Sequence, residues 1–276
     1  MENYPEAIIT VNGKKYEADL LVFDKDGLMF DSEQFWVELA NARMRVLTAH
    51  FSASEILSWA ALMGVRTKID GEKITAADID PTGILAVASP EEEMTLLAGF
   101  LVSRTGMIWN EARHLARDLF DRADRDIDLK RALKPQPGFI DLMRRLGELN
   151  IPYGVATSDT YARTRESMSM FGCWENVRFV VTPTDVAKGK PEPDMLQLIS
   201  EKQHVPAERI VMLGDSYVDV KMADAAGSIG IGITPDKAMQ QKMEPFATEI
   251  VSSLEKITVD QGYRGGINYG KNDIRH

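Results

Sequence analysis

The hydrophobic pattern at the start of the chain predicts a hairpin followed by a buried strand. Residues 7–11 are rich in β-formers, Asn12-Gly13 is typical of a type I′ turn, and residues 14–18 form the returning strand. Residues 20–23 are a continuous apolar run, which suits a strand buried on both faces of a parallel sheet. This run ends in the polar segment Asp24-Lys25-Asp26-Gly27.

From about Phe35 to Leu133 the pattern changes to helical spacing. The segment is rich in Ala, Leu, Met, Glu and Arg, and runs of β-branched residues are few. Its apolar residues predict helices over 35–47, 56–62, 94–102 and 112–119. We therefore expect an all-helical domain here, with a solvated helix face in the densely charged stretch 110–129.

After Lys134-Pro-Gln-Pro-Gly138 strand-like and helix-like segments alternate. The expected strands are 153–157, 178–181, 210–213 and 229–233, and the expected helices are 139–149, 161–170, 194–202 and 218–226. The alternation predicts an α/β fold with a Rossmann-like, doubly wound parallel sheet. Residues 20–23 belong to that sheet, so the helical block is an insertion after its first strand.

These patterns divide the chain into four parts. We expect an N-terminal hairpin and first core strand (1–32), a helical cap domain (33–134), the remainder of the core (135–259) and a tail (260–276). The tail is rich in Gly and polar residues, so it is either disordered or held by a partner subunit. The hairpin could pair with the edge of the core sheet or with another chain, which leaves both a monomer and a homodimer open.

Composition narrows the possible functions. The chain has 276 residues, of which 44% are hydrophobic and 27% charged, as in ordinary globular proteins. Its single cysteine, Cys173, excludes a disulfide framework and a multi-cysteine zinc site. The net charge of −10 argues against nucleic-acid binding. There is no apolar run of about 18 residues and no signal-peptide pattern, so we expect a cytoplasmic protein without membrane contact.

Polar residues follow each strand of the predicted sheet. Because the carboxyl ends of parallel strands meet at one edge, we expect these side chains to converge there. In chain order they are Asp24, Asp26 and Gly27; Thr157 and Ser158; Lys188 and Lys190; Asp215 and Asp219.

This set of residues suits phosphoryl chemistry. The four aspartates cannot all stay ionised side by side without compensation, and a hard divalent cation such as Mg²⁺ supplies it. Lys190, Thr157 and backbone N–H groups add positive charge and donors for a phosphoryl group. Asp24 is placed to act as a nucleophile, and Asp26 as general acid and then base.

The segments Asp24-x-Asp26-Gly27, Thr157, Lys190 and Gly214-Asp215-x-x-x-Asp219 resemble the four motifs of the haloacid dehalogenase-like superfamily, in the family's order. The insert resembles the C1 cap of its phosphoglycolate phosphatase and β-phosphoglucomutase branch. The resemblance implies an Mg²⁺-dependent phosphatase that acts on a small phosphorylated metabolite, such as a sugar phosphate or phosphoglycolate, through an aspartyl-phosphate.

The resemblance also implies a role for each residue. Asp24 would be nucleophile and metal ligand, and Asp26 acid–base residue and metal ligand through its backbone carbonyl. Thr157 and Ser158, together with Gly27, would bind the phosphoryl group. Lys190, rather than the neighbouring Lys188, would neutralise that group. Asp215 and Asp219 would complete the metal site, with Asp219 acting through water or supporting Lys190.

The cap and the overall reaction leave alternatives open. Arg66 lies in a segment that resembles the specificity loop of C1 caps and is a candidate substrate contact. Lys68 could act as a Schiff-base lysine in a phosphonate hydrolase, but Asp26 disfavours that activity. A phosphomutase of the β-phosphoglucomutase type has the same motifs. A non-catalytic regulator that binds a phosphorylated metabolite is the alternative from another class.

Overall fold

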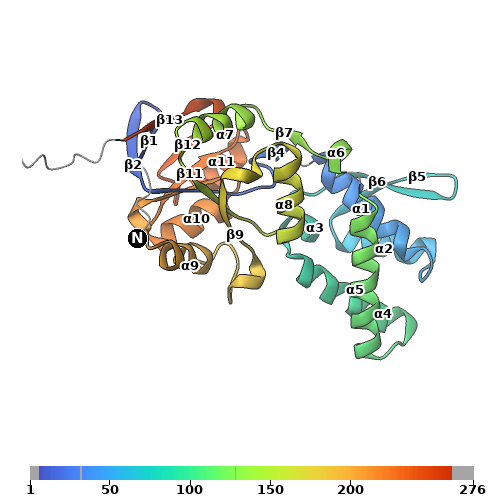
Figure 1. The fold of residues 1–276 in the computed structure, drawn as a ribbon. Coiled ribbons are helices and arrows are strands. Elements are labelled where there is room, and N and C mark those ends of the chain that lie inside the picture. The colour runs from blue at the N-terminus through green and yellow to red at the C-terminus, as the bar shows by residue number, and fades with distance from the viewer. Residues whose placement is uncertain (1–5, 32, 128, 263–276) are drawn as a thin grey trace, which may run out of the picture.

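The centre of the molecule is a six-stranded sheet, seen in a computed structural model that describes residues 6–31, 33–127 and 129–262 (Figure 1). Every neighbouring pair of its strands is parallel. In spatial order the strands are β12 (Glu249–Val251), β11 (Ile229–Ile233), β10 (Ile210–Gly214), β3 (Leu20–Phe23), β8 (Tyr153–Ala156) and β9 (Val177–Val181). The predicted Rossmann-like, doubly wound core is confirmed.

Strand β3 shows why the continuous apolar runs become central strands. Its four side chains are fully buried. Leu21 and Phe23 belong to one hydrophobic cluster and Leu20 and Val22 to another, because successive side chains of a strand point to opposite faces. Helix α7 (Phe139–Glu148) precedes β8. The helices that follow β8, β9, β10 and β11 are α8 (Tyr161–Met170), α9 (Asp194–Gln203), α10 (Tyr217–Ala226) and α11 (Lys237–Met243).

The order of the strands sets the position of the site. From β3 the chain continues to β8 and β9 on one side, and then crosses to β10, β11 and β12 on the other. The order in which the chain adds strands therefore reverses between β3 and β10. At such a point α/β folds leave a crevice at the carboxyl ends of the strands. The first residue after β3, Asp24, donates its backbone N–H to the carbonyl oxygen of Leu213 on β10 (2.9 Å).

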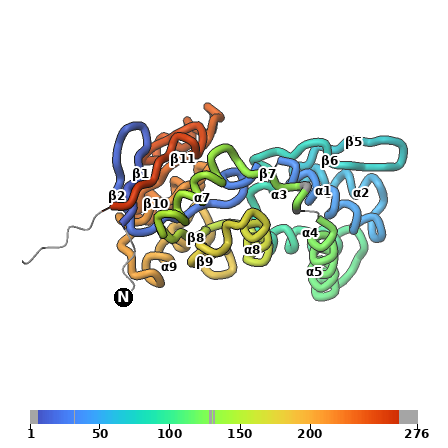
Figure 2. The backbone as a smooth tube through the Cα atoms, turned by 45° about the horizontal axis from the view of Figure 1, so that its top comes forward, coloured from blue at the N-terminus to red at the C-terminus, as the bar shows by residue number. Residues whose placement is uncertain are grey.

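Helices α1 to α6 and strands β5 and β6, which come between β3 and α7 in the chain, form the body at the right of Figures 1 and 2. A two-stranded ladder of β4 (Phe30–Asp31) and β7 (Lys134–Pro135) joins its two ends. Its helices are α1 (Glu33–Leu47), α2 (Ala53–Leu62), α3 (Ile84–Val87), α4 (Pro90–Thr105), α5 (Trp109–Arg125) and α6 (Leu129–Ala132). We call residues 33–134 the cap.

The expectation of an all-helical cap is wrong. Strands β5 (Val65–Asp70) and β6 (Lys73–Ile79) form an antiparallel hairpin that projects from the helices (Figure 2). The signal was Asp70-Gly71, a frequent hairpin turn, between segments with alternating apolar residues. In the structure Asp70 pairs with Lys73, so Gly71 and Glu72 form the turn, and Gly71 has a φ of 58° in the left-handed region.

A second, smaller sheet contains the N-terminal hairpin. Strands β1 (Ala7–Val11) and β2 (Lys14–Ala18) pair as predicted, and both turn residues, Asn12 and Gly13, have positive φ. The hairpin pairs with β13 (Ile257–Gln261), not with the edge of the core sheet. The predicted tail therefore begins too early, because Asp260 and Gln261 are strand residues. The rest of the expected tail, 263–276, lies outside the described residues.

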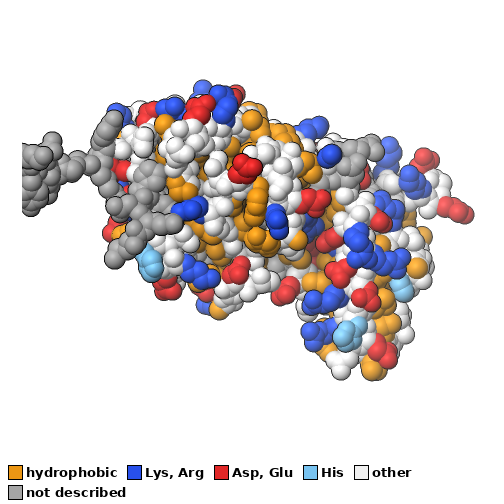
Figure 3. All heavy atoms as spheres, in the orientation of Figure 1, with side chains coloured by type: hydrophobic (Ala, Val, Ile, Leu, Met, Phe, Trp, Pro, Cys, Tyr) orange, Lys and Arg blue, Asp and Glu red, His pale blue; other side chains and the backbone are white. Residues whose placement is uncertain are grey.

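Charged residues cover the outer face of α5. Its buried residues are apolar, mainly Ala112, Ala116, Leu119, Phe120 and Ala123. Acidic and basic side chains intermingle over this part of the surface (Figure 3), which confirms the predicted solvated face. Within the described ranges, no helix has the length and apolar content needed to cross a membrane.

Candidate active site

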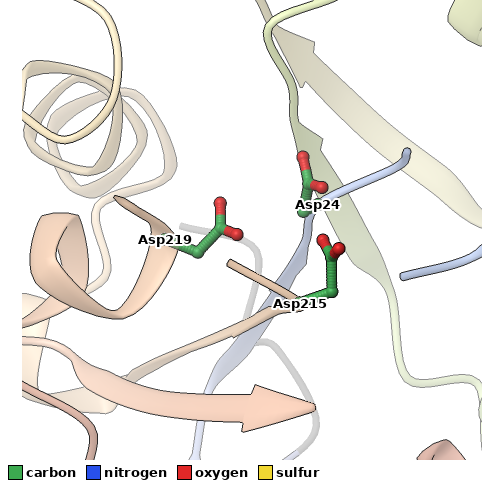
Figure 4. Close-up of side chains that lie close together, drawn as sticks. All are labelled: Asp24, Asp215 and Asp219. Carbon is green, nitrogen blue, oxygen red and sulfur yellow. The ribbon is translucent and has the colours of Figure 1, made fainter. Parts of the chain in front are cut away.

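The predicted site residues meet at the carboxyl edge of the core sheet. Asp24 follows β3, Asp215 follows β10, and Asp219 lies in the first turn of α10. Their carboxyl groups point toward a common space (Figure 4). One carboxylate oxygen from each lies within 4.8 Å of the others.

Lys190 binds two of these three carboxylates. Its Nζ lies 2.6 Å from Oδ1 of Asp24 and 2.6 Å from Oδ1 of Asp219. The side chain of Lys190 is only 3% exposed, so both contacts are shielded from solvent. Lys188 is exposed, and its backbone N–H bonds to Asp194. The preference for Lys190 over Lys188 thus agrees with the geometry.

Local backbone structure fixes the aspartates. Asp219 is buried and accepts a hydrogen bond from the backbone N–H of Ser216 (3.1 Å), which caps helix α10. Gly214 leaves room for it, since a β-carbon there would lie 2.2 Å from that of Asp219. Gly27 has a φ of 86°, and it also passes close to Asp215. The two glycines allow backbone and carboxylates to approach closely.

The charges of this cluster do not balance. Three carboxylates face one ammonium group, that of Lys190. Burial, reinforced by the charges of Asp24 and Asp219, raises the pKa of Asp215 well above its usual range. Burial also raises the pKa of Asp24, although Lys190 partly opposes this. The excess of hard oxygen donors and negative charge fits Mg²⁺. The residues that the sequence points to therefore suit the expected metal.

Thr157 follows β8, the strand next to β3 in the sheet. It is almost fully buried, and its Oγ1 accepts the backbone N–H of Asp159 (3.0 Å). The hydroxyl proton of Thr157 remains available to a phosphoryl oxygen. Ser158 is half-buried and also precedes helix α8. A helix N-terminus with free donors favours an anion at this position.

Asp26 turns away from the carboxylate cluster. Its Oδ1 accepts a hydrogen bond from Nζ of Lys25 (2.5 Å), so its side chain is not among the three clustered carboxylates. This arrangement is compatible with a metal contact through its backbone carbonyl, which stays a prediction. Burial raises the pKa of Asp26 to about 6, although Lys25 lowers it. A carboxyl with such a pKa can donate and accept a proton near neutral pH.

Sequence reasoning missed the group that surrounds Asp26. Lys25 is 1% exposed and also pairs with Asp159, whose carboxylate in turn binds Arg163. Burial by itself would raise the pKa of Asp159. The charges of Lys25 and Arg163 outweigh this effect and lower the pKa to about 2. The available signal was a lysine between two site aspartates, directly after a buried strand.

The structure does not bring the proposed cap residues to the catalytic carboxylates. Arg66 lies on β5, is 70% exposed and forms an ion pair with Asp78 of the same hairpin (2.8 Å). Lys68 is exposed on the same strand. Substrate contact by Arg66 therefore stays a prediction.

Comparison with known proteins agrees with this geometry. A family model described as haloacid dehalogenase-like hydrolase matches residues 18–227. The chain belongs to the haloacid dehalogenase-like hydrolases. The match spans the first strand, the cap and the core through α10, so it includes every proposed catalytic residue.

Several relatives of this chain have names that describe them as phosphatases. (DL)-glycerol-3-phosphatase 2 from Arabidopsis thaliana is 26% identical over 242 residues, which cover 85% of this chain and 86% of that protein. Phosphoglycolate phosphatase from Escherichia coli is 26% identical over 124 residues, which cover 45% of this chain and 49% of that protein. Together with family membership, these names confirm the prediction of a phosphatase-type hydrolase.

Solved structures confirm the fold. CbbY from Rhodobacter sphaeroides, solved in complex with phosphate, matches with a TM-score of 0.56 at 19% identity. The match covers 86% of this chain and 95% of that chain. Both the sheet and the cap are thus part of a shared architecture.

Proposed function

We propose that this haloacid dehalogenase-like hydrolase is an Mg²⁺-dependent phosphatase that forms an aspartyl-phosphate on Asp24. The observation that carries the proposal is the position of Lys190, whose Nζ is 2.6 Å from both Asp24 and Asp219. This ammonium group orients the nucleophilic carboxylate and offsets its charge as an anionic phosphoryl group approaches.

In the first step, Asp24 attacks the phosphoryl group. A carboxylate oxygen of Asp24 forms a bond to phosphorus, while the bond from phosphorus to the leaving oxygen breaks. Asp26, protonated, delivers its proton to that oxygen, so the alcohol leaves neutral. The hydroxyl of Thr157 and the backbone N–H groups ahead of α8 bind the transferring phosphoryl oxygens.

In the second step, water replaces Asp24. Asp26 is now ionised and accepts a proton from the water, whose oxygen bonds to phosphorus as the bond to Asp24 breaks. The products are phosphate, free Asp24 and a reprotonated Asp26. The residues that would hold Mg²⁺ are Asp24, Asp215 and the backbone carbonyl of Asp26, with Asp219 in support. Bound there, the ion would act as a Lewis acid and offset the negative charge of the phosphoryl oxygens.

The substrate that we propose is a small phosphorylated metabolite with an alkyl leaving group. Support comes from the full-length similarity to a glycerol-3-phosphatase and the partial similarity to phosphoglycolate phosphatase. The cap lies over the same end of the core sheet and selects the leaving group by shape.

The test is phosphate release from a panel of small esters, with and without Mg²⁺. The panel contains glycerol 3-phosphate, phosphoglycolate and hexose phosphates. We expect Mg²⁺-dependent release by the wild type and loss of at least 10³-fold in Asp24→Asn, since the amide is not a nucleophile. Asp224→Asn, exposed on α10, serves as a matched control and keeps its activity.

Other outcomes would contradict the proposal in different ways. Turnover that requires a sugar bisphosphate and yields an isomer instead of phosphate would indicate a phosphomutase. Saturable binding of an ester without turnover, unchanged in Asp24→Asn, would indicate a regulator that binds phosphorylated metabolites.

A further inference from the structure

A buried lysine lies directly against the acid–base residue. Lys25 is 1% exposed, and its Nζ lies 2.5 Å from Oδ1 of Asp26 and 2.9 Å from Oδ2 of Asp159. Transfer of an ammonium group from water to the protein interior is strongly unfavourable unless it is paired and hydrogen-bonded. A buried lysine with two carboxylate partners is therefore a specific arrangement and not a by-product of packing.

Asp159 is itself held rigidly. Its Oδ1 accepts hydrogen bonds from Nε of Arg163 (2.7 Å) and from the backbone N–H of Thr160 (2.7 Å). These contacts leave Oδ2 for Lys25. The ring of Phe35, on α1 of the cap, covers both cations, with its centroid 5.8 Å from Nζ of Lys25 and 5.7 Å from Cζ of Arg163.

The two carboxylates around Lys25 have different roles. Asp159, which Lys25 shares with Arg163, gives Lys25 a carboxylate partner at 2.9 Å, so Lys25 stays in place whether Asp26 is ionised or protonated. An ammonium group only donates hydrogen bonds, so the Asp26 oxygen that faces it must accept one in both states. That oxygen is Oδ1, and the proton of Asp26 must therefore reside on Oδ2. Within the part of the chain that the structure describes, no hydrogen bond to Oδ2 is present.

We infer that Lys25 and Asp159 are a positioning pair that directs the catalytic proton of Asp26 to Oδ2 and holds that atom toward the leaving oxygen. This inference rests on the proposed function, in which Asp26 protonates the leaving group. It adds two residues to the reaction that touch neither the phosphoryl group nor the metal. Their effect is specific to the proton transfer.

Dependence on the leaving group distinguishes this role from general structural support. An alkyl leaving group needs a proton, whereas nitrophenolate leaves without one. The measured quantity is kcat/KM, which includes the departure of the leaving group but not later steps. The substrates are the alkyl ester that the wild type hydrolyses best and p-nitrophenyl phosphate.

We expect Lys25→Met to lower kcat/KM about 10²-fold for the alkyl ester, the usual size of a general-acid contribution, and less than about fivefold for the nitrophenyl ester. Lys202→Met, an exposed lysine on α9, is the matched control and changes neither value. Because Lys25→Met takes away the partner of Asp159 Oδ2, although Arg163 still holds Oδ1, the double variant Lys25→Met/Asp159→Asn is measured as well. It removes the charges of Lys25 and Asp159 together and leaves Arg163 with Asp124 (3.6 Å); it should show the same difference between the esters.

Equal losses for both esters, or no loss for the alkyl ester, would overturn the inference. Circular dichroism and the melting temperature show whether each variant is folded. Failure of the proposed function has a different signature: the wild type then releases no phosphate from either ester, and the positioning role falls with it.

Discussion

Gly27 and Asp215 are so close that no side chain fits between them. A β-carbon on Gly27 would lie 2.1 Å from Oδ2 of Asp215, well inside contact distance. The φ of Gly27 is also 86°, where residues other than glycine are strained. The loop after the nucleophile and the carboxylate after β10 are thus packed directly against one another.

We therefore expect Gly27→Ala to inactivate the enzyme. The β-carbon must displace Asp215, and the backbone strain adds about 1 kcal/mol. Phosphate release should fall by at least 10²-fold, and urea unfolding should show a lower free energy of unfolding. Gly13→Ala is the matched control, since Gly13 has a similar φ of 77° but nothing within 4 Å of a β-carbon. Equal activity of the two variants would contradict the packing argument.

Asp215→Asn should separate metal binding from stability. Without metal, the neutral amide removes one of three neighbouring carboxylates, so we expect the melting temperature to rise above that of the wild type. Mg²⁺ should stabilise the wild type through binding but leave the variant unchanged. The readout is thermal unfolding with Mg²⁺ and with EDTA, and Asp224→Asn, exposed on α10, is the control. An equal Mg²⁺ shift in both variants would rule out Asp215 as a ligand.

Glu249 should make stability depend on acid pH. It accepts hydrogen bonds from Asn12 (2.9 Å), Lys14 (2.6 Å) and Tyr16 (2.6 Å), which tie the N-terminal hairpin to β12. These bonds lower its pKa from 4.5 to about 2. Because the pKa of Glu249 is lower in the folded state, Glu249 stabilises the protein at pH values above 4.5. This stabilisation is lost as pH falls from 4.5 to about 2.

Glu249→Gln should therefore cost about 1 to 2 kcal/mol at neutral pH, and its difference from the wild type should shrink in acid. Urea unfolding at a series of pH values measures this. Glu17→Gln is the control, because Glu17 is 67% exposed in its pair with Arg209 and should contribute little. A difference between Glu249→Gln and the wild type that does not change with pH would contradict the assigned role.

Asp124 should couple the cap to the core. It lies on α5 of the cap, and its Oδ1 is 3.0 Å from Nη2 of Arg43 and 3.6 Å from Nη1 of Arg163 in the core. Arg43 is 4% exposed, so loss of Asp124 leaves a buried charge without this partner. We expect Asp124→Asn to lower stability by about 1 to 3 kcal/mol and to speed hydrogen exchange in α5. Asp121 is exposed one turn earlier on α5, and Asp121→Asn should change neither stability nor hydrogen exchange. Equal results for Asp124→Asn and Asp121→Asn would refute the coupling.

Much of the site could be predicted from the sequence because parallel strands impose order. Continuous apolar runs such as residues 20–23 are typical of strands buried on both faces, and the residues that follow them share one edge. This is sufficient to bring Asp24 and Asp215 together without coordinates, and the family resemblance adds Lys190. The β5–β6 hairpin was missed because helical spacing in its neighbours outweighed the turn signal of Asp70-Gly71.

The fold class, the insertion of the cap after the first core strand and the positions of Asp24 and Asp215 follow from local periodicity and strand ends, which any reader of the sequence can recognise. That Asp26 faces Lys25 and not the other three aspartates, with Asp159 and Arg163 behind it, depends on how the chain packs. Pairing of buried charges depends on which side chains share a low-dielectric space, and no local pattern records that. For the same reason, the pairing of β13 with the hairpin and the outward place of Arg66 emerged only from the packed chain.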